Sequence, residues 1–104
     1  MSWHGILACF FGGAFLANSL PHLMNGVSGR AFQSPFAKPP GQGLSSSTVN
    51  VLWGFFNLAV AYWLFAYLGH FSPRSLAYML PCAAGFLLMC LVLARGFGRF
   101  HGGR

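Results

Sequence analysis

The sequence contains no aspartate and no glutamate, and charged residues make up only 6% of its 104 positions. A small water-soluble domain needs about a quarter of its residues charged to coat its surface, so this composition excludes an ordinary soluble globule. The missing acids also exclude a carboxylate general base, an all-oxygen Ca²⁺ or Mg²⁺ site and the acidic proton relay of many coupled pumps. The composition therefore predicts a membrane protein, most of whose surface contacts lipid.

The charges that are present are all positive, six Lys and Arg residues in total. They are spread over loops and the tail, so they indicate membrane topology and not nucleic-acid binding. Twelve Phe, three Trp and three Tyr exclude disorder as the reason for the low charge. At this length we expect one integral membrane domain, residues 1–104, with no separate soluble core.

Three apolar segments are long enough to cross a hydrocarbon core of about 30 Å. We place them at about 5–24, 49–69 and 76–94. They predict an all-α membrane protein of three transmembrane helices, with a long ordered loop, 25–48, between the first and second helices. Pro21 and His22 lie near the end of the first span, so we expect its last turn to fray, kink or pack against protein. The short 70–75 connection predicts an antiparallel hairpin of the second and third helices.

The positive charges are distributed unevenly between the two sides of such a bundle. The N-terminus and the 70–75 turn hold only Arg74, whereas the loop 25–48 and the basic tail 95–104 hold Arg30, Lys38, Arg95, Arg99 and Arg104. Positive residues favour the cytoplasmic side, which predicts the N-terminus outside and the C-terminus and long loop in the cytoplasm. The first four residues contain no Lys or Arg, so we expect the first span to be a retained helix and not a cleaved signal peptide.

One stretch, 17–58, resembles a motif of small bacterial membrane proteins. The resemblance rests on four short segments: Pro21-His22, Pro35-Phe36, Pro39-Pro40-Gly41-Gln42-Gly43 and Asn50-Val51-Leu52-Trp53-Gly54. It implies a multi-pass protein of a bacterial-type inner (plasma) membrane, and it implies no particular activity.

Polar residues inside the predicted spans form the first candidate site. Asn18 and His22 share one face of the first helix, and a stripe of the second helix carries Asn50, Gly54, Asn57 and Ala61. Because polar groups in lipid turn toward partners, we expect the four polar side chains to meet. One alternative is that these side chains only form structural hydrogen bonds between the helices. The other is a functional site, in which His22 ligates the metal of a haem or chlorophyll, shuttles a proton, or helps line a polar path.

The long loop forms the second candidate site. Arg30 and Lys38 bring positive charge, and the glycines and serines that follow could offer backbone amides at a helix N-terminus, which suits an anion such as a lipid phosphate. The residues of this candidate anion- or lipid-binding site are Arg30, Lys38, Gly41, Gly43, Ser45, Ser46 and Ser47. The alternative is ordinary serine capping combined with positive-inside topology.

Catalysis has little support, because a Ser or Cys nucleophile needs a base and usually an orienting carboxylate. We therefore assign no catalytic residue and no metal site. Cys9, Cys82 and Cys90 lie inside spans and read as buried small hydrophobes. His101, in the basic tail, is expected to be a solvated residue at the interface.

These features favour a small non-enzymatic inner-membrane protein, an accessory or assembly subunit of a larger membrane complex, with lipid or anion anchoring by the loop 25–48. The alternative is an oligomeric small-solute or anion transporter or channel lined by the Asn and His residues, and a third hypothesis is haem or chlorophyll binding through His22. The expected partners are membrane lipids and a larger complex or further copies of the chain, with no nucleic acid. The sequence identifies no cofactor, and a bound anionic lipid is one candidate.

Overall fold

The computed structural model describes residues 2–103 and is dominated by three helices long and apolar enough to cross a membrane. The elements are α1 (Trp3–Val27), β1 (Phe32–Gln33), β2 (Leu44–Ser45), α2 (Ser47–Trp63), a π-helical turn η1 (Leu64–Leu68) and α3 (Leu76–His101). The two short strands pair antiparallel within the long loop, with Phe32 opposite Ser45.

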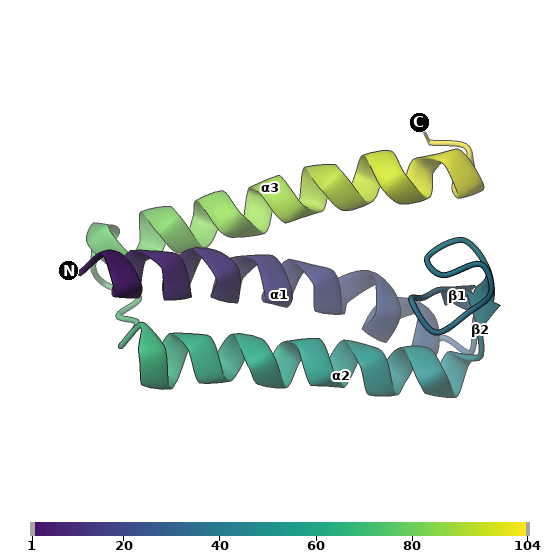
Figure 1. Ribbon diagram of the computed structural model, residues 1–104, viewed down its shortest axis with the longest axis horizontal. Coiled ribbons are helices and arrows are strands. Elements are labelled where there is room, and N and C mark those ends of the chain that lie inside the picture. The colour runs from purple at the N-terminus through teal and green to yellow at the C-terminus, as the bar shows by residue number, and fades with distance from the viewer. Residues whose placement is uncertain (1, 104) are drawn as a thin grey trace.

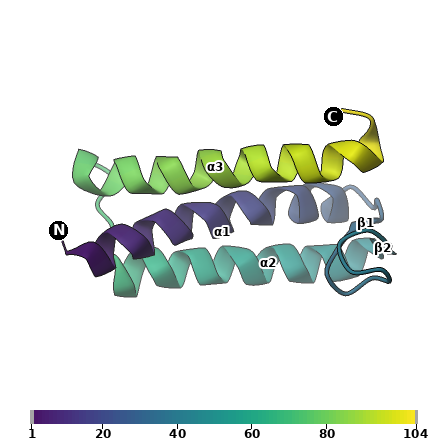
Figure 2. The same cartoon turned by 45° about the horizontal axis from the view of Figure 1, so that its top comes forward.

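The three helices lie side by side with α1 in the middle, as Figures 1 and 2 show. Helix α1 packs along its length against both α2 and α3, whereas α2 and α3 scarcely contact each other. The N-terminus and the connection from η1 to α3 lie at one end, and the β1–β2 loop and the C-terminus lie at the other. Helices α2 and α3 therefore run antiparallel, as expected, but they do not pack against each other, because α1 lies between them.

Glycines on two faces of α1 and its neighbours explain why α1 takes the middle position. A Cβ on Gly85 of α3 would collide with the Phe10 carbonyl oxygen, and one on Gly13 would collide with the Cys82 carbonyl. On the opposite face, a Cβ on Gly54 of α2 would come within 2.9 Å of the Leu23 backbone nitrogen. Small residues let helix backbones approach closely in lipid, so α1 receives a close neighbour on each side.

The helices run further than the predicted spans. Helix α1 continues through Pro21 to Val27, and the Pro21 carbonyl accepts a hydrogen bond of 2.7 Å from the Asn25 side chain. Helix α3 continues through most of the predicted tail to His101 and ends at Gly102, whose φ of 80° gives the left-handed cap that glycine favours. Positive side chains suit the last turns of a helix because of its dipole, so the basic tail begins as helix.

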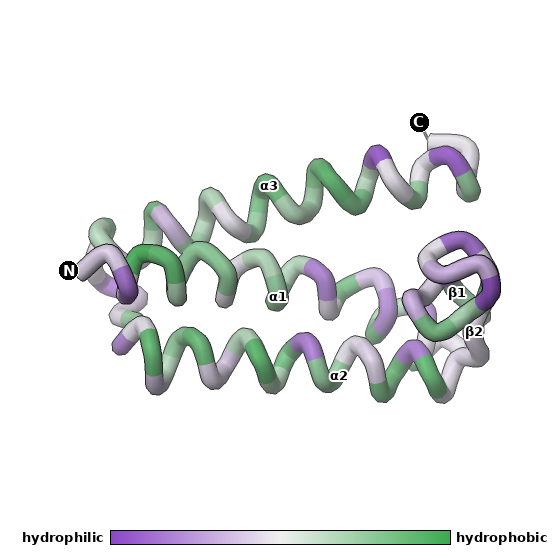
Figure 3. The backbone as a smooth tube through the Cα atoms, in the orientation of Figure 1, coloured by the Kyte–Doolittle hydropathy of each residue, from purple (hydrophilic) through white to green (hydrophobic). Residues whose placement is uncertain are grey.

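The outer faces of the layer are apolar and open. In the most apolar 18-residue stretch of each candidate span, 44% of the residues are buried in α1, but only 17% in Ser47–Leu68 and 11% in α3. Figure 3 shows the hydrophobic colour along most of each helix, with hydrophilic positions concentrated at the ends and in the parts of α1 and α2 nearer the loop. The surfaces of α2 and α3 are thus built to meet lipid or another apolar helix.

Replacing Gly85 by alanine tests the close contact of α1 with α3. We expect Gly85→Ala to lower the free energy of unfolding in detergent by about 1–3 kcal/mol, the usual cost of overpacking, because the new methyl group collides with the Phe10 carbonyl. Gly96→Ala is the matched control on the same helix, since a Cβ there meets nothing within 4 Å. Equal stability of the two variants would contradict the proposed contact.

Candidate functional site

Four polar side chains gather where α1 and α2 pack together in the half of the layer nearer the loop. Asn18 and His22 come from α1, and Asn50 and Asn57 come from α2; we call these four residues the polar cluster. The stripe predicted on the second helix, Asn50, Gly54, Asn57 and Ala61, is the complete set of buried residues in α2. The helical period of the sequence thus identified the face of α2 that meets α1.

The first pair of the polar cluster joins Asn18 to Asn57. The Asn18 Nδ2 donates to the Asn57 Oδ1 at 2.9 Å, and the Asn57 Nδ2 donates to the Trp53 carbonyl one turn earlier at 2.8 Å. Asn57 is fully buried, whereas Asn18 is half-buried. This pair ties the two helices together through a hydrogen bond to a fully buried asparagine.

The second pair joins His22 to Asn50, one turn nearer the loop. The His22 Nδ1 lies 2.7 Å from the Asn50 Oδ1, and both side chains are buried. The Asn50 Nδ2 lies within hydrogen-bond distance of three backbone carbonyls, so both of its hydrogens have acceptors and its oxygen is left to accept. His22 therefore donates from Nδ1, and in the neutral ring Nε2 carries no proton.

Asn50 also holds the long loop against the helices. Its Nδ2 is 3.1 Å from the carbonyl of Phe32 in β1, 3.2 Å from that of Ser45 in β2 and 3.0 Å from that of Ser46. One side chain thus connects α1, α2 and both strands. The hydroxyls of Ser34 and Ser45 lie 2.6 Å apart and form a further link across the loop.

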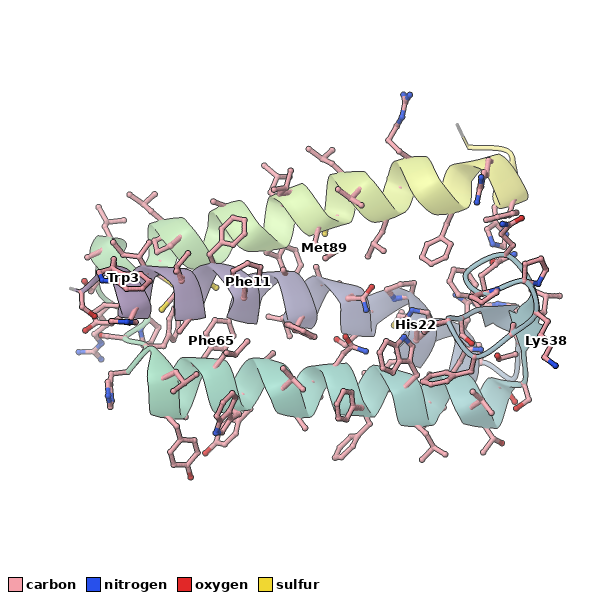
Figure 4. All side chains as sticks on the ribbon, in the orientation of Figure 1. Trp3, Phe11, His22, Lys38, Phe65 and Met89 are labelled. Atoms are coloured by element: carbon pink, nitrogen blue, oxygen red, sulfur yellow. The ribbon has the colours of Figure 1, made fainter. Side chains whose placement is uncertain are left out.

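Aromatic rings enclose His22, the histidine labelled in Figure 4. Phe32, Trp53 and Phe97 approach its ring edge to face, with centroids 5.6, 6.3 and 6.1 Å away. Trp53 belongs to α2 and Phe97 to α3, so both other helices and the loop contribute to the shell around this α1 side chain. The imidazole is held in one orientation by a hydrogen bond on one side and by packed rings around it.

His101 is exposed, as expected for a solvated tail residue, and it also contacts the loop. Its ring stacks on Phe32 at a centroid distance of 5.2 Å, and its Nε2 lies 2.9 Å from the Oε1 of Gln33. The end of α3 is thereby attached to β1. Sequence reasoning misses Phe97 and the loop contacts of His101, because both residues follow the apolar run that marks the predicted span, and nothing local signals that the helix continues.

The loop residues of the candidate anion site do not form a ring of free amides. The Gly41 amide donates to the Ser34 carbonyl at 2.8 Å, and the Gly43 amide donates to the Pro39 carbonyl at 2.9 Å. The Ser46 side chain caps α2 by accepting from the Val49 amide, as the capping alternative predicts, and Ser47 is the first residue of that helix.

The two cations of this loop lie on the surface. Both side chains are exposed, and the Arg30 Nε donates to the Asn25 Oδ1 at 3.1 Å. Arg30 and Lys38 are therefore available to an outside ligand.

The polar cluster is mostly closed rather than open. His22, Asn50 and Asn57 are between 0% and 2% exposed, and within residues 2–103 no buried side-chain nitrogen or oxygen lacks a hydrogen-bond partner. Asn18 differs, because it also lines a groove between α1 and α3. The hydrogen bonds of the polar cluster therefore fix the positions of two helices and the loop relative to one another.

Comparison with protein-family models, with curated proteins and with solved structures finds no match to this chain.

Replacing Asn50 by leucine tests its role as the link between helices and loop. We expect Asn50→Leu to lower the free energy of unfolding by about 1–3 kcal/mol, because it leaves the His22 Nδ1 and buried loop carbonyls without partners. It should also speed amide hydrogen exchange in residues 32–45 well before global unfolding.

Asn57→Leu is the matched control, since it removes a buried asparagine of the same helix that has no bond to the loop. We expect it to lower stability while leaving exchange in the loop at the rate set by global unfolding. Equal acceleration of amide hydrogen exchange in the loop of both variants would show that Asn50 does not stabilise the loop specifically.

Proposed function

We propose that this chain is a small non-enzymatic membrane protein that packs as an accessory or assembly subunit against a larger membrane complex. The observation that supports this most is the flat layer in which α1 is covered on both sides while α2 and α3 leave their outer faces bare. Exposed large apolar side chains follow one face of α3, among them Leu80, Leu87 and Leu91. Such a layer offers a long apolar helix surface to a partner in the plane of the membrane.

The positive end of the molecule provides the second support. Arg30 and Lys38 in the loop and Arg95 and Arg99 near the end of α3 belong to the same end of the layer, and the chain contains no Asp or Glu to neutralise them. Their expected counter-charges are lipid phosphates, a bound anion or the carboxylates of another protein. Positive-inside orientation would place this end in the cytoplasm and the N-terminus outside, in a bacterial-type inner membrane.

The state of the polar cluster favours a structural role over a solute path or a haem site. Three of its four side chains are buried in hydrogen bonds to protein, so they would have to break these bonds before they could line a path. His22 is packed on several sides by aromatic rings, which leaves its ring in protein contact. These contacts support an architectural role for the cluster.

Purification from native membranes in mild detergent tests the proposal. We expect the tagged chain to migrate in a discrete assembly much larger than its own 11.3 kDa, and we expect Leu80→Ala, Leu87→Ala and Leu91→Ala together to release it as a folded small species, because they remove apolar contact area from α3. A chain that chemical cross-linking in intact membranes finds only as a monomer would contradict an accessory role.

Neutralising the positive end tests the expected anionic-lipid contact. We expect replacement of Arg30, Lys38, Arg95 and Arg99 by glutamine to reduce the anionic lipid retained in native mass spectrometry, by about fivefold per residue if each contributes about 1 kcal/mol. Arg74→Gln is the control, since Arg74 lies in the connection at the opposite end. An equal loss of lipid from the control would contradict a specific role for the loop end.

A further inference from the structure

The backbone of Arg30 is fixed at the end of α1 by the way this helix stops. Gly29 has a φ of 74°, the left-handed conformation that favours glycine, and its amide donates to the Gly26 carbonyl at 3.0 Å. The Arg30 amide then donates to the Asn25 carbonyl at 2.9 Å. These two bonds form a Schellman cap, which ties the residue after the left-handed glycine to the last turn of the helix. Arg30 therefore moves with α1 and not with the rest of the loop.

The side chain of Arg30 is aligned by the same asparagine. Its Nε donates to the Asn25 Oδ1 at 3.1 Å, while the Asn25 Nδ2 donates to the Pro21 carbonyl at 2.7 Å. The bond to Pro21 decides the orientation of the amide, because only its nitrogen can donate to a carbonyl, and its oxygen is left to accept from Arg30. Among the Lys and Arg side chains of residues 2–103, only that of Arg30 has a hydrogen bond to protein.

Most of the Arg30 guanidinium stays available to a ligand. A guanidinium carries five N–H groups in a planar fork, and Asn25 takes one of them. The side chain is exposed, and the sequence has no Asp or Glu to pair with it. The four N–H groups on the two Nη atoms are therefore free, within the described part of the chain, for an anion with two oxygens. This fork geometry matches a phosphate, to which arginine donates two parallel hydrogen bonds.

An apolar surface of α1 leads up to Arg30. Leu20, Met24 and Val27 are large exposed side chains in the last two turns of the helix. Their spacing of four and three residues puts them on one helix face. A phospholipid has both an oxyanion for the guanidinium and an acyl chain for this face, whereas a free phosphate would leave the apolar side chains uncovered.

We propose that Arg30, aligned by Asn25, binds the phosphate of an anionic phospholipid whose acyl chain lies along Leu20, Met24 and Val27. This inference rests on the anionic-lipid contact proposed above and names the residue that recognises the phosphate there. Arg30 acts through two hydrogen bonds of fixed direction, which an ammonium group cannot reproduce. The other cations of the loop end contribute charge alone.

Exchange of Arg30 for lysine separates this geometry from charge. The intact protein is extracted from nanodiscs of equal phosphatidylglycerol and phosphatidylcholine, and the retained lipid is measured by native mass spectrometry. We expect Arg30→Lys to reduce the retained phosphatidylglycerol about fivefold, because the charge stays but one of the two hydrogen bonds is lost. Arg95→Lys is the matched control, since Arg95 is also exposed near the loop end, and it should retain as much as the parent chain.

Two results would overturn this inference. Equal retention of phosphatidylglycerol by Arg30→Lys and Arg95→Lys would show that the loop end attracts lipid by charge alone. The broader lipid contact would survive that result, because the glutamine variants test it separately. A parent chain that retains no more phosphatidylglycerol than phosphatidylcholine would show that Arg30 does not bind an anionic lipid, and would leave the carboxylate of a partner protein as its counter-ion.

Inorganic phosphate at constant ionic strength distinguishes a lipid from a free ion. We expect it to displace little phosphatidylglycerol, because it offers no acyl chain to the apolar face of α1. Displacement down to the level of the Arg30→Lys variant would overturn the lipid as the ligand.

Asn25 is a positioning residue, and its role is tested through Arg30. Asn25→Ala keeps every charge but releases the guanidinium, so we expect about threefold less retained phosphatidylglycerol and no further loss when it is combined with Arg30→Lys. Ser28→Ala is the matched control, because it removes another side-chain bond at the end of α1, to the Met24 carbonyl, that does not involve Arg30. Equal lipid loss in Asn25→Ala and Ser28→Ala, or additive loss in the double variant, would overturn the role of Asn25.

Discussion

The hydrogen bonds of the Asn50 side chain hold together the loop end of this molecule. Its oxygen accepts from His22 of α1, and its amide nitrogen reaches carbonyls in β1, β2 and the start of α2. A chain without acidic residues cannot hold such a loop with ion pairs. In a medium that supplies no competing water, one saturated amide can do so, because each unmade bond there would cost more than in water.

The packing of the helices depends on glycines, because a residue without a side chain lets two backbones come close together. Glycines at the crossing of α1 with α3 and at the face of α2 let two backbones reach α1 from opposite sides. Since lipid tails are as apolar as leucine, close van der Waals contact and hydrogen bonds hold membrane helices together more than the burial of apolar surface does. This explains a layer of three helices whose outer members keep their large apolar side chains exposed.

The cations at the loop end have no acidic side chain in the sequence to neutralise them. Arg30 and Lys38 lie exposed on the loop, and Arg95 and Arg99 lie exposed near the end of α3. Their counter-ions therefore come from outside the chain, unlike the partners of the polar cluster, which lie within it.

The amino-acid sequence by itself determined the membrane class, the three apolar spans and the face of α2 that turns inward. The composition indicates a lipid environment. The period of an α-helix places Asn50, Gly54, Asn57 and Ala61 on one face, independently of what packs against that face. The four polar residues named from the sequence lie together in two hydrogen-bonded pairs, because α1 and α2 run in opposite directions and must match polar groups at equal depth.

Only the tertiary structure decided that α1 lies between α2 and α3, that α3 continues to His101, and that the four polar residues form two separate pairs. Each of these depends on contacts between distant segments: the Phe10 carbonyl against Gly85, the His101 ring on Phe32, and the Asn50 amide on the loop. Hydrophobic runs and local residue spacing do not predict such contacts, because the contacts depend on which backbones can approach each other in space.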